Sequence, residues 1–257
     1  MTSKTVSELA EQAGRLIKAA RSVVALTGAG ISTPSGIPDF RSQDSGLWRR
    51  FDPMAVATLS VFRYQPQRFY EWVRPLVASI LDAEPNAAHE ALARLEAAGF
   101  LSGVITQNID DLHHRAGSKN VYEVHGHVRR ATCIQCYRTY STEGQIEAFV
   151  SDGVIPRCDD CGGILKPDIV LFGEQLPGSV VRAAKQLIDE CDLIIIAGSS
   201  LEVTPVASLP VHALNQGARL ILVNIEPTYL DERAEVLIHD DVINVLPVIA
   251  DKLLEPR

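Results

Sequence analysis

The chain has 257 residues, which fits one α/β domain with a smaller addition, and its 46% hydrophobic and 22% charged residues are ordinary for a globular protein. The formal net charge of −8 argues against non-specific nucleic-acid binding, because such binding depends on neutralising phosphates. The longest apolar run, residues 193–197, is far too short to cross a bilayer. We therefore expect a cytoplasmic protein with no membrane partner and no specific nucleic-acid partner.

The chain begins with a helical pattern and not with the apolar core of a signal sequence. Apolar residues recur at helical spacing through residues 6–20, and Thr5 with Glu8 matches a capping box. Short apolar runs then alternate with helical patterns. The expected strands cover residues 23–26, 104–106, 193–196, 220–223 and 242–245, and the expected helices cover 86–98, 178–190, 205–217 and 248–254. Strands this apolar suit a sheet covered on both faces, so the order predicts an α/β fold with a doubly wound, Rossmann-like parallel sheet.

Two stretches interrupt this alternation. Residues 45–80 are rich in aromatic residues and arginine with helical spacing, and residues 128–165 contain all four paired cysteines. We expect both to form a smaller module, helical in the first part and zinc-binding in the second. The large part would comprise about residues 1–44, 81–127 and 166–257, with the active cleft between the two. No linker or repeat divides the chain, so one catalytic unit over residues 1–257 is expected.

The paired cysteines indicate a metal site. They form two C-x-x-C pairs, Cys133 with Cys136 and Cys158 with Cys161. Two such pairs are typical of a tetrahedral zinc site, and the glycines at 162 and 163 suit the tight turn in which backbone N–H groups face sulfur. A redox pair is the alternative, although it would show a single C-x-x-C opening a helix after a strand. No histidine or glutamate joins the four cysteines, so the zinc would be structural. Cys191 stands apart and is interpreted as a small buried apolar residue.

The first expected strand leads directly into a glycine-containing loop, Gly28-Ala29-Gly30. Glycines there allow backbone N–H groups to approach a diphosphate. The G-x-G pattern alone is equally consistent with an ordinary strand-to-loop turn, because the third glycine of a dinucleotide-binding motif is missing. The sequence continues as a long turn-rich loop to residue 41, and not as the helix of a dehydrogenase.

Further motifs follow in a fixed order. They are TQNID at residues 106–110, EVHG at 123–126, KPDIVLFGE at 166–174 and GSSLEVTP at 198–205. Together with residues 28–41, they resemble the signatures of the sirtuin family, over about residues 10–250, and most closely its compact bacterial and archaeal members. The resemblance implies an NAD-dependent protein lysine deacetylase. Such an enzyme transfers the acyl group of an acyl-lysine protein or peptide to ADP-ribose, and it releases nicotinamide, O-acyl-ADP-ribose and the deacylated lysine. It also implies that NAD is consumed, that one structural zinc is bound, and that the protein is a monomer.

The resemblance assigns cofactor residues at matching positions. On the nicotinamide side these are Ala29, Ile37, Phe40, Gln107, Asn108, Ile109 and Asp110. Toward the phosphates and adenosine they are Thr33, Arg41, Ser199, Ser200, Asn224, Glu226 and Val242. Asn108 would also be catalytic, holding the ribose or a water molecule. From the residue types alone, Asn108 could form an Asx turn and Asp110 could cap a helix.

His125 is the implied general base, since it matches the His-Gly pair of the family and would deprotonate a ribose hydroxyl. His89, His113 and His114 are interpreted as structural, packing or surface residues. Residues 169–174 and 200–203 are expected to be extended edges between which a substrate strand docks, the alternative being ordinary core strands. The implied substrate residues are Val170, whose carbonyl would accept the acyl-lysine N–H, and Phe172, Gly173, Glu174 and Val203.

The acyl group is predicted to be uncharged. Sirtuins that prefer succinyl or malonyl groups carry a Tyr-x-x-Arg pair, whereas this chain has Tyr70 followed by Val73, with Arg74 one residue late. One residue turns a helical side chain by about 100°. Two other functions compete with deacylation: ADP-ribosyl transfer or NAD hydrolysis on the same fold, and a zinc-binding module that only senses NAD. The 166–174 motif argues against the first, and the presence together of Asn108 and His125 argues against the second.

Overall fold

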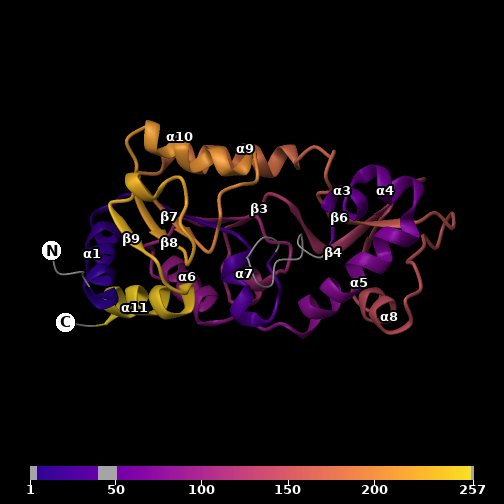
Figure 1. Ribbon diagram of the computed structural model, residues 1–257, viewed down its shortest axis with the longest axis horizontal. Helices are drawn as coiled ribbons and strands as arrows, with labels where there is room; N and C mark the ends of the chain where they lie inside the picture. Colours follow the sequence, from indigo (N-terminus) through magenta and orange to yellow (C-terminus); the bar gives the residue numbers. More distant parts are fainter. Residues whose placement is uncertain (1–4, 40–50, 256–257) are drawn as a thin grey trace.

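A computed structural model of the chain describes residues 5–39 and 51–255. Two modules lie side by side along its long axis (Figure 1). The large module is built on a six-stranded sheet and the small module on a three-stranded sheet. In the described residues, no helix combines the length and the apolar character needed to span a membrane.

The large sheet is parallel throughout, in the order β3-β2-β1-β7-β8-β9. Its strands are β1 (Val23–Thr27), β2 (Gly103–Thr106), β3 (Val121–Glu123), β7 (Leu193–Ala197), β8 (Arg219–Val223) and β9 (Val236–Ile238). The expected strands at 23–26, 104–106, 193–196 and 220–223 are confirmed. Strand order reverses between β1 and β7, and in open α/β sheets ligands bind outside the carboxyl ends of the strands at such a point.

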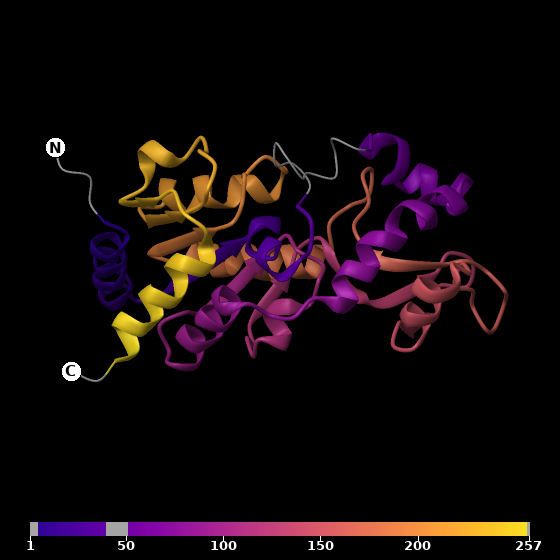
Figure 2. The same cartoon turned by 60° about the horizontal axis from the view of Figure 1, so that its bottom comes forward.

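Helices cover both faces of this sheet (Figure 1). One face carries α1 (Val6–Ala19), α6 (Ala87–Ala97) and α11 (Val242–Leu254), and the other carries α9 (Gly178–Glu190) and α10 (Leu209–Asn215). Successive residues of β1 point to opposite faces of the sheet. Val23 and Ala25 pack in the core under the first set of helices, and Val24 and Leu26 pack in the core under the second. The Thr5–Glu8 capping box of α1 is present as predicted. Helices α1 and α11 lie at the end of the large module away from the small one (Figure 2).

One expected strand is wrong. Residues 242–245 are the first turn of α11, which begins after Asp241, and the Asp241 carboxylate accepts a hydrogen bond from Ile243 N at 3.2 Å. The β-branched residues and Pro247 make this segment look unlike a helix. Its buried residues nevertheless recur at three- and four-residue steps, which is the period of a helix. These are Val242, Val245, Leu246, Ile249 and Ala250.

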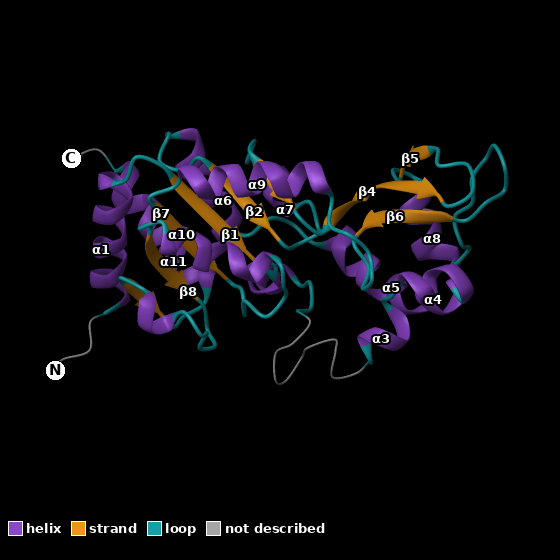
Figure 3. Cartoon of the chain, turned by 90° about the horizontal axis from the view of Figure 1, so that it is seen from above, coloured by secondary structure: helices purple, strands orange, loops and turns teal. Residues whose placement is uncertain are grey.

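The small module combines four helices and three strands within the described residues. The helices are α3 (Pro53–Val56), α4 (Leu59–Tyr64), α5 (Pro66–Asp82) and α8 (Gln145–Asp152), and the strands are β4 (Gly126–Cys133), β5 (Thr139–Ser141) and β6 (Leu165–Ile169). The sheet is antiparallel in the order β5-β4-β6, and α4, α5 and α8 lie against one of its faces (Figure 3). Phe62, Phe69 and Phe149 form the centre of the core between them.

Short helices occupy the loops that connect the modules and the strand ends. They are α7 (Leu112–Arg115) and the 3₁₀ helices η1 (Ala29–Ile31), η2 (Thr33–Ser35), η3 (Val206–Ser208) and η4 (Asp231–Arg233). The first three of these follow the carboxyl ends of β2 and β1, so they stand at the edge of the large sheet where the reversal of strand order predicts a ligand site.

Candidate active site between the modules

A cavity of about 310 Å³ lies between the two modules. The large module contributes the loops after β1 and β2, and the small module contributes one face of α5. The sequence-predicted residues that line it are Ala29, Ile37, Gln107, Asn108, Ile109, Asp110, His125, Val170, Phe172, Gly173, Glu174 and Val203. The structure thus brings together the implied nicotinamide, base and substrate residues. Phe40 and Arg41 lie outside the described residues.

Helix α5 forms one wall of the cavity, and of its residues only Val73 was predicted to lie beside the acyl group. Trp72, Leu76 and Ile80 line the cavity together with Val73. Steps of four residues place side chains on one face of a helix. These side chains therefore form an apolar stripe that could have been predicted from the 45–80 region. The stripe is covered only where the large module lies opposite it.

The loops after β1 and β7 touch closely at the point where strand order reverses. Gly30 N–H donates a 2.9 Å hydrogen bond to the Gly198 carbonyl, and a Cβ at Gly30 would lie 2.9 Å from that oxygen. Gly198 itself has φ +62°, and its Cβ would lie 2.4 Å from Ile31 N. Side chains at these two positions would force the loops apart, so the glycines permit the close approach of the two loops. The approach of these N–H groups to a diphosphate stays a prediction.

Ser32 joins two of the cavity residues. Its hydroxyl donates to Asp110 Oδ2 at 2.6 Å and accepts from Asn108 Nδ2 at 2.9 Å. Asp110 Oδ1 accepts from Leu112 N at 3.0 Å, so this carboxylate lines the cavity and also holds the start of α7. Burial raises the pKa of Asp110, and the hydrogen bonds from Ser32 and Leu112 oppose that rise. The role of Ser32 was not predicted from the sequence, because its contacts join two loops that are far apart in the chain.

Two buried histidines pack beside the hydrogen-bonded group of Ser32, Asn108 and Asp110. His89 and His113 are almost fully buried, and their rings meet edge to face with centroids 4.8 Å apart. His89 Nδ1 accepts from Asn86 N at 3.3 Å, so its proton is on Nε2, which lies 3.5 Å from Ser32 Oγ. Burial lowers the pKa of His89 to about 4 and that of His113 well below its usual value. Both are neutral packing residues near pH 7, as predicted.

His125 occupies the junction of the modules, between β3 and β4. Its Nδ1 lies 3.0 Å from the Gln107 carbonyl oxygen. Because a carbonyl can only accept, Nδ1 carries the proton and Nε2 carries the lone pair. The next residue, Gly126, has φ +79°, and a Cβ there would lie 2.0 Å from the Asp168 carbonyl oxygen. Only glycine fits this turn, which explains why the histidine is followed by glycine.

The segment after β6 presents its backbone to the cavity. Val170 N donates to the His125 carbonyl at 2.8 Å, and Phe172 is bonded through both its N–H and its carbonyl to the 57–59 backbone, at 3.0 Å each. Among the described residues, no backbone N–H donates to the Val170 carbonyl. Glu174 Oε2 accepts from Leu171 N at 2.8 Å and from Lys166 Nζ at 2.9 Å, which fixes the end of the segment.

The second expected edge, residues 200–203, is not continuously extended. Leu201 has φ +58°, and its N–H turns back to Ser199 Oγ at 3.3 Å. Val203 still reaches the cavity, and its carbonyl accepts from Ala207 N at 2.9 Å. The expectation of an extended backbone is therefore wrong at Leu201.

The described residues predicted for the phosphates and adenosine follow the carboxyl ends of β1, β7, β8 and β9, and none of them lines this cavity. They are Thr33, Ser199, Ser200, Asn224, Glu226 and Val242. Ser199 Oγ accepts from Gln107 Nε2 at 3.0 Å, which links this group to the cavity. Asn224 Nδ2 donates to the Glu226 carbonyl at 2.6 Å, and Val242 is the first residue of α11.

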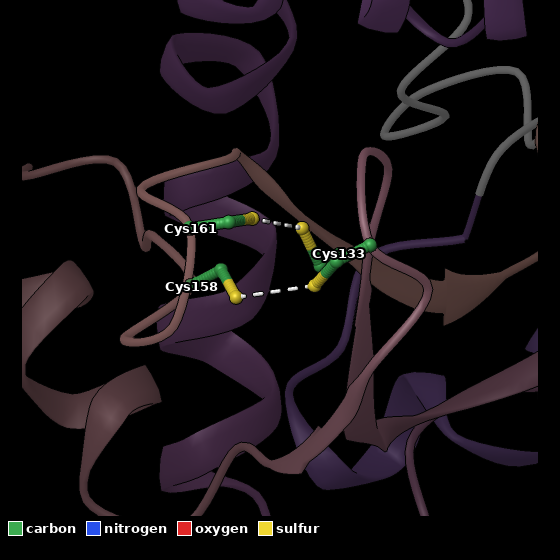
Figure 4. A group of neighbouring side chains, drawn as sticks. Cys133, Cys158 and Cys161 are labelled. Carbon is green, nitrogen blue, oxygen red and sulfur yellow. Dashed lines mark hydrogen bonds between the residues drawn. The ribbon is translucent and has the colours of Figure 1, made fainter.

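The four paired cysteines converge at the far side of the small module (Figure 4). Cys133 Sγ lies 3.5 Å from Cys161 Sγ, Cys136 Sγ lies 3.5 Å from Cys158 Sγ, and all four sulfurs are within 4.8 Å of one another. Zinc with Zn–S bonds of about 2.3 Å places tetrahedral ligands about 3.8 Å apart. Disulfide sulfurs would be about 2.05 Å apart. The set therefore fits a structural zinc, and the redox alternative is not supported.

The turn around the cysteines is shaped for such an ion. A Cβ at Gly163 would lie 2.8 Å from Cys133 Sγ, so glycine is required beside the sulfur. Gln135 N points at the same sulfur from 3.4 Å. The Tyr140 hydroxyl lies 2.9 Å from Cys158 Sγ and donates to Asp160 Oδ2 at 2.5 Å. The Gln135 N–H is a donor that favours the thiolate form of Cys133, which is the form that zinc binds.

Comparison with known proteins gives one family throughout. The chain is 46% identical over 232 residues to the NAD-dependent protein deacetylase 2 of Caldanaerobacter subterraneus subsp. tengcongensis, covering 90% of this chain and 91% of the relative. It is 44% identical to the NAD-dependent protein deacylase 2 of Archaeoglobus fulgidus, over 96% of both chains.

Solved structures agree with this result. A chain described as "Structural Basis for the Mechanism and Regulation of Sir2 Enzymes" superposes with a TM-score of 0.90 at 43% identity, covering 96% of this chain and 98% of that one. One described as "Sir2-p53 peptide-NAD+" gives a TM-score of 0.86 at 39% identity, over 94% and 97%. The model of the Sir2 family matches residues 28–205, and the chain belongs to that family.

Proposed function

We propose that this chain is an NAD-dependent protein lysine deacetylase. It transfers the acyl group of an acyl-lysine to ADP-ribose and releases nicotinamide, O-acyl-ADP-ribose and the free lysine. The observation that carries the proposal is the cavity between the modules, where Asp110, Asn108 and His125 face the same space as the Val170 edge. Relatives named as deacetylases and deacylases, and a related structure described with p53 peptide and NAD+, support the reaction and the peptide substrate.

The nicotinamide end of the cavity combines one carboxylate with apolar walls. Asp110 can accept hydrogen bonds from a carboxamide NH₂, while Ala29, Ile37 and Ile109 exclude water around the reacting carbon. Bound NAD supplies an electrophilic ribose carbon and nicotinamide as leaving group. Asn108, held by Ser32, is positioned to orient the ribose or a water molecule. Phe40 is proposed to complete this wall, and Arg41 is proposed to contact a phosphate.

His125 is proposed as the general base. Its Nδ1 proton is held by the Gln107 carbonyl at 3.0 Å, so Nε2 is the atom that takes the proton from a ribose hydroxyl. The backbone of the same residue is held as well, because the His125 carbonyl accepts from Val170 N. The same hydrogen bond couples the base to the segment on which the peptide would lie.

The peptide is proposed to dock as an added strand along residues 170–174. The Val170 carbonyl would accept the amide N–H of the acyl-lysine side chain. Phe172, Gly173 and Glu174 would flank the peptide on one side and Val203 on the other. Since β-augmentation depends on backbone bonds, sequence selectivity would be weak.

The remaining cofactor contacts follow the edge of the sheet. Thr33, Ser199 and Ser200 are proposed to bind the diphosphate, with Gln107 supporting Ser199. Asn224 and Glu226 would bind the adenosine ribose, and the backbone at Val242 would face adenine. The four cysteines would hold one zinc that stabilises the small module and takes no part in the chemistry.

One assay tests the proposal against its rivals. Purified protein is mixed with NAD⁺, with or without an acetyl-lysine peptide, and nicotinamide and the peptide mass are followed. A deacetylase releases nicotinamide only when the peptide is present, together with loss of the acetyl group. Release without peptide would indicate NAD hydrolysis, transfer of ADP-ribose to protein would indicate the transferase, and absence of turnover would indicate a sensing module.

The state and location of the enzyme are also proposals. We infer a cytoplasmic monomer without a specific nucleic-acid partner, and the net charge of −8 supports the last point. Light scattering of the eluting protein tests the oligomeric state, since a dimer would show twice the mass of a 28.0 kDa chain.

A further inference from the structure

Arg129, on β4, joins three separate elements. Its Nη1 donates to Glu123 Oε1 at 2.8 Å, its Nη2 donates to Glu123 Oε2, and its Nη1 also donates to Asp111 Oδ1. Glu123 is the last residue of β3, and Asp111 immediately precedes α7. Bidentate pairing of this kind fixes direction as well as distance. One side chain of the small module therefore holds the ends of two elements of the large module.

The two carboxylates stand next to the residues of the proposed site. Asp111 follows Asp110, and Glu123 lies two residues before His125. The Val128 N–H donates to the Ile109 carbonyl at 3.2 Å and ties β4 to the same loop a second time. Displacement of either carboxylate would move a cavity residue along with it.

The backbone at Asp111 is under local strain. Its φ of +68° lies in the left-handed region, which is unfavourable for residues other than glycine. Aspartate tolerates this region better than most residues. The hydrogen bond from Arg129 is an external contact that can hold Asp111 in this conformation, and with it the direction in which Asp110 enters the cavity.

Charge balance gives an independent reason for a cation here. Asp110, Asp111 and Glu123 place three carboxyl groups within a short span, and Glu123 and Asp111 add to the rise in the pKa of Asp110 that burial causes first. Asp111, Glu123 and His114 also lie within metal-binding distance of one another. However, the guanidinium already bonds the first two, so the group is an ion-pair cluster.

We infer that Arg129 is a positioning residue for the reaction proposed above: by holding Asp111 and Glu123 it sets the places of Asp110 and His125. This inference rests on the proposed function. Arg129 does not line the cavity itself and would act only through its partners.

The adjacent arginine provides a matched control. Arg130 donates to Asp168 at 3.0 Å, but its side chain is 59% exposed, against 36% for Arg129. Exposed ion pairs contribute little to stability. Arg130→Met therefore removes an ion pair from the same strand without affecting the loops that carry Asp110 and His125.

The experiment compares Arg129→Met, Arg129→Lys and Arg130→Met with the unmodified protein. It measures kcat, KM for NAD and inhibition by the product nicotinamide, together with zinc content and thermal unfolding. We expect Arg129→Met to lower kcat roughly 10- to 100-fold, as a small misplacement of reacting groups can. Nicotinamide inhibition should weaken because the pocket around Asp110 is disturbed. Arg129→Lys should recover part of both effects, and Arg130→Met should stay within about twofold of the unmodified protein.

Each outcome decides the inference. A folded, zinc-containing Arg129→Met protein with unchanged kcat and nicotinamide inhibition overturns it, and so does a loss no larger than that of Arg130→Met. If Arg129→Met does not fold, Asp111→Gly replaces it, because glycine removes the acceptor of Arg129 Nη1 and adopts the φ of +68° readily, while both bonds from Arg129 to Glu123 remain. Unchanged nicotinamide inhibition in that variant overturns the inference equally. An unmodified protein that shows no peptide-dependent nicotinamide release would contradict the proposed function instead.

Discussion

The two modules of the chain are held together in different ways. In the large module, β1 and β7 are buried along their whole length between two layers of helices. In the small module, β5 is mostly exposed, and the core under the cysteine turn consists of Ala131, Leu165 and two of the cysteines themselves. Apolar burial stabilises the first module, whereas the zinc end of the second has too little apolar core and depends on its metal ligands. The proposed active site lies where these two kinds of structure meet.

Removal of a metal ligand should have the largest effect. Cys158→Ala should abolish zinc binding, because structural zinc supplies on the order of 10 kcal/mol of apparent folding free energy. Zinc analysis and limited proteolysis, with cleavage concentrated in the small module, test this expectation. Cys191→Ala is the control, since Cys191 is buried in the large module and should leave zinc content unchanged. A Cys158→Ala protein that is zinc-free, folded and fully active would show that the cysteines have another role.

Substitution of His125, which lies at the junction of the modules, should lower the rate of the reaction and leave the stability of the protein unchanged. His125→Ala is expected to lower kcat by about 10²–10⁴-fold, the usual loss for a general base, with zinc content and unfolding temperature unchanged. Turnover is measured at saturating NAD and peptide. His212→Ala, an exposed histidine paired with Asp189, is the control. Near wild-type turnover in His125→Ala would remove this residue from the role of base.

A matched pair of core substitutions sharpens the comparison between modules. Leu92 and Leu165 are both fully buried, Leu92 on α6 and Leu165 opposite Cys133 in the small sheet. Each change to alanine should lower the free energy of unfolding by about 2–5 kcal/mol. Only Leu165→Ala should also weaken zinc binding, measured by competition with a chelator. Equal zinc affinity in the two variants would contradict the difference drawn between the modules.

The smallest expected effect concerns the acyl group. Val73 lines the cavity, whereas Arg74 points away and donates to the Val150 and Ser151 carbonyls at 2.9 and 2.7 Å. A succinyl carboxylate would enter without a charged partner, and hydrogen bonds to charged groups contribute about 1.5–3 kcal/mol, or roughly 10- to 150-fold. Acetyl-lysine should exceed succinyl-lysine by this factor in kcat/KM on one peptide.

A substitution tests the register behind that prediction. Val73→Arg should narrow the gap between the two acyl groups by placing a guanidinium in the cavity. The gain should be partial, because the Tyr70 hydroxyl already donates to the Leu165 carbonyl. Equal or higher efficiency with succinyl-lysine in the unmodified protein would refute the acyl preference.

The sequence predicted most of the large module because its strands are buried on both faces and leave a simple apolar signal. Strands β3 and β9 were missed, since each has three residues at or next to a sheet edge, and residues 242–245 were misread as a strand. The cavity residues were predictable as motifs because each motif occupies one loop. Ser32 and Arg129 were not, since their roles arise from contacts between loops distant in sequence. The proposed module boundaries, and the roles of Phe40 and Arg41, stay predictions.

The order of strands in the large sheet has a consequence for synthesis on the ribosome. β1 is made first, yet it lies at the centre of the sheet and its second neighbour, β7, ends only at Ala197. At about 5–20 residues per second, β1 waits roughly 10–30 s with one apolar edge unpaired. An unpaired edge of this kind is a site for association with other chains. The growing chain therefore passes through a vulnerable period that the finished enzyme does not show, and its yield in a cell should depend on chaperones that shield this strand.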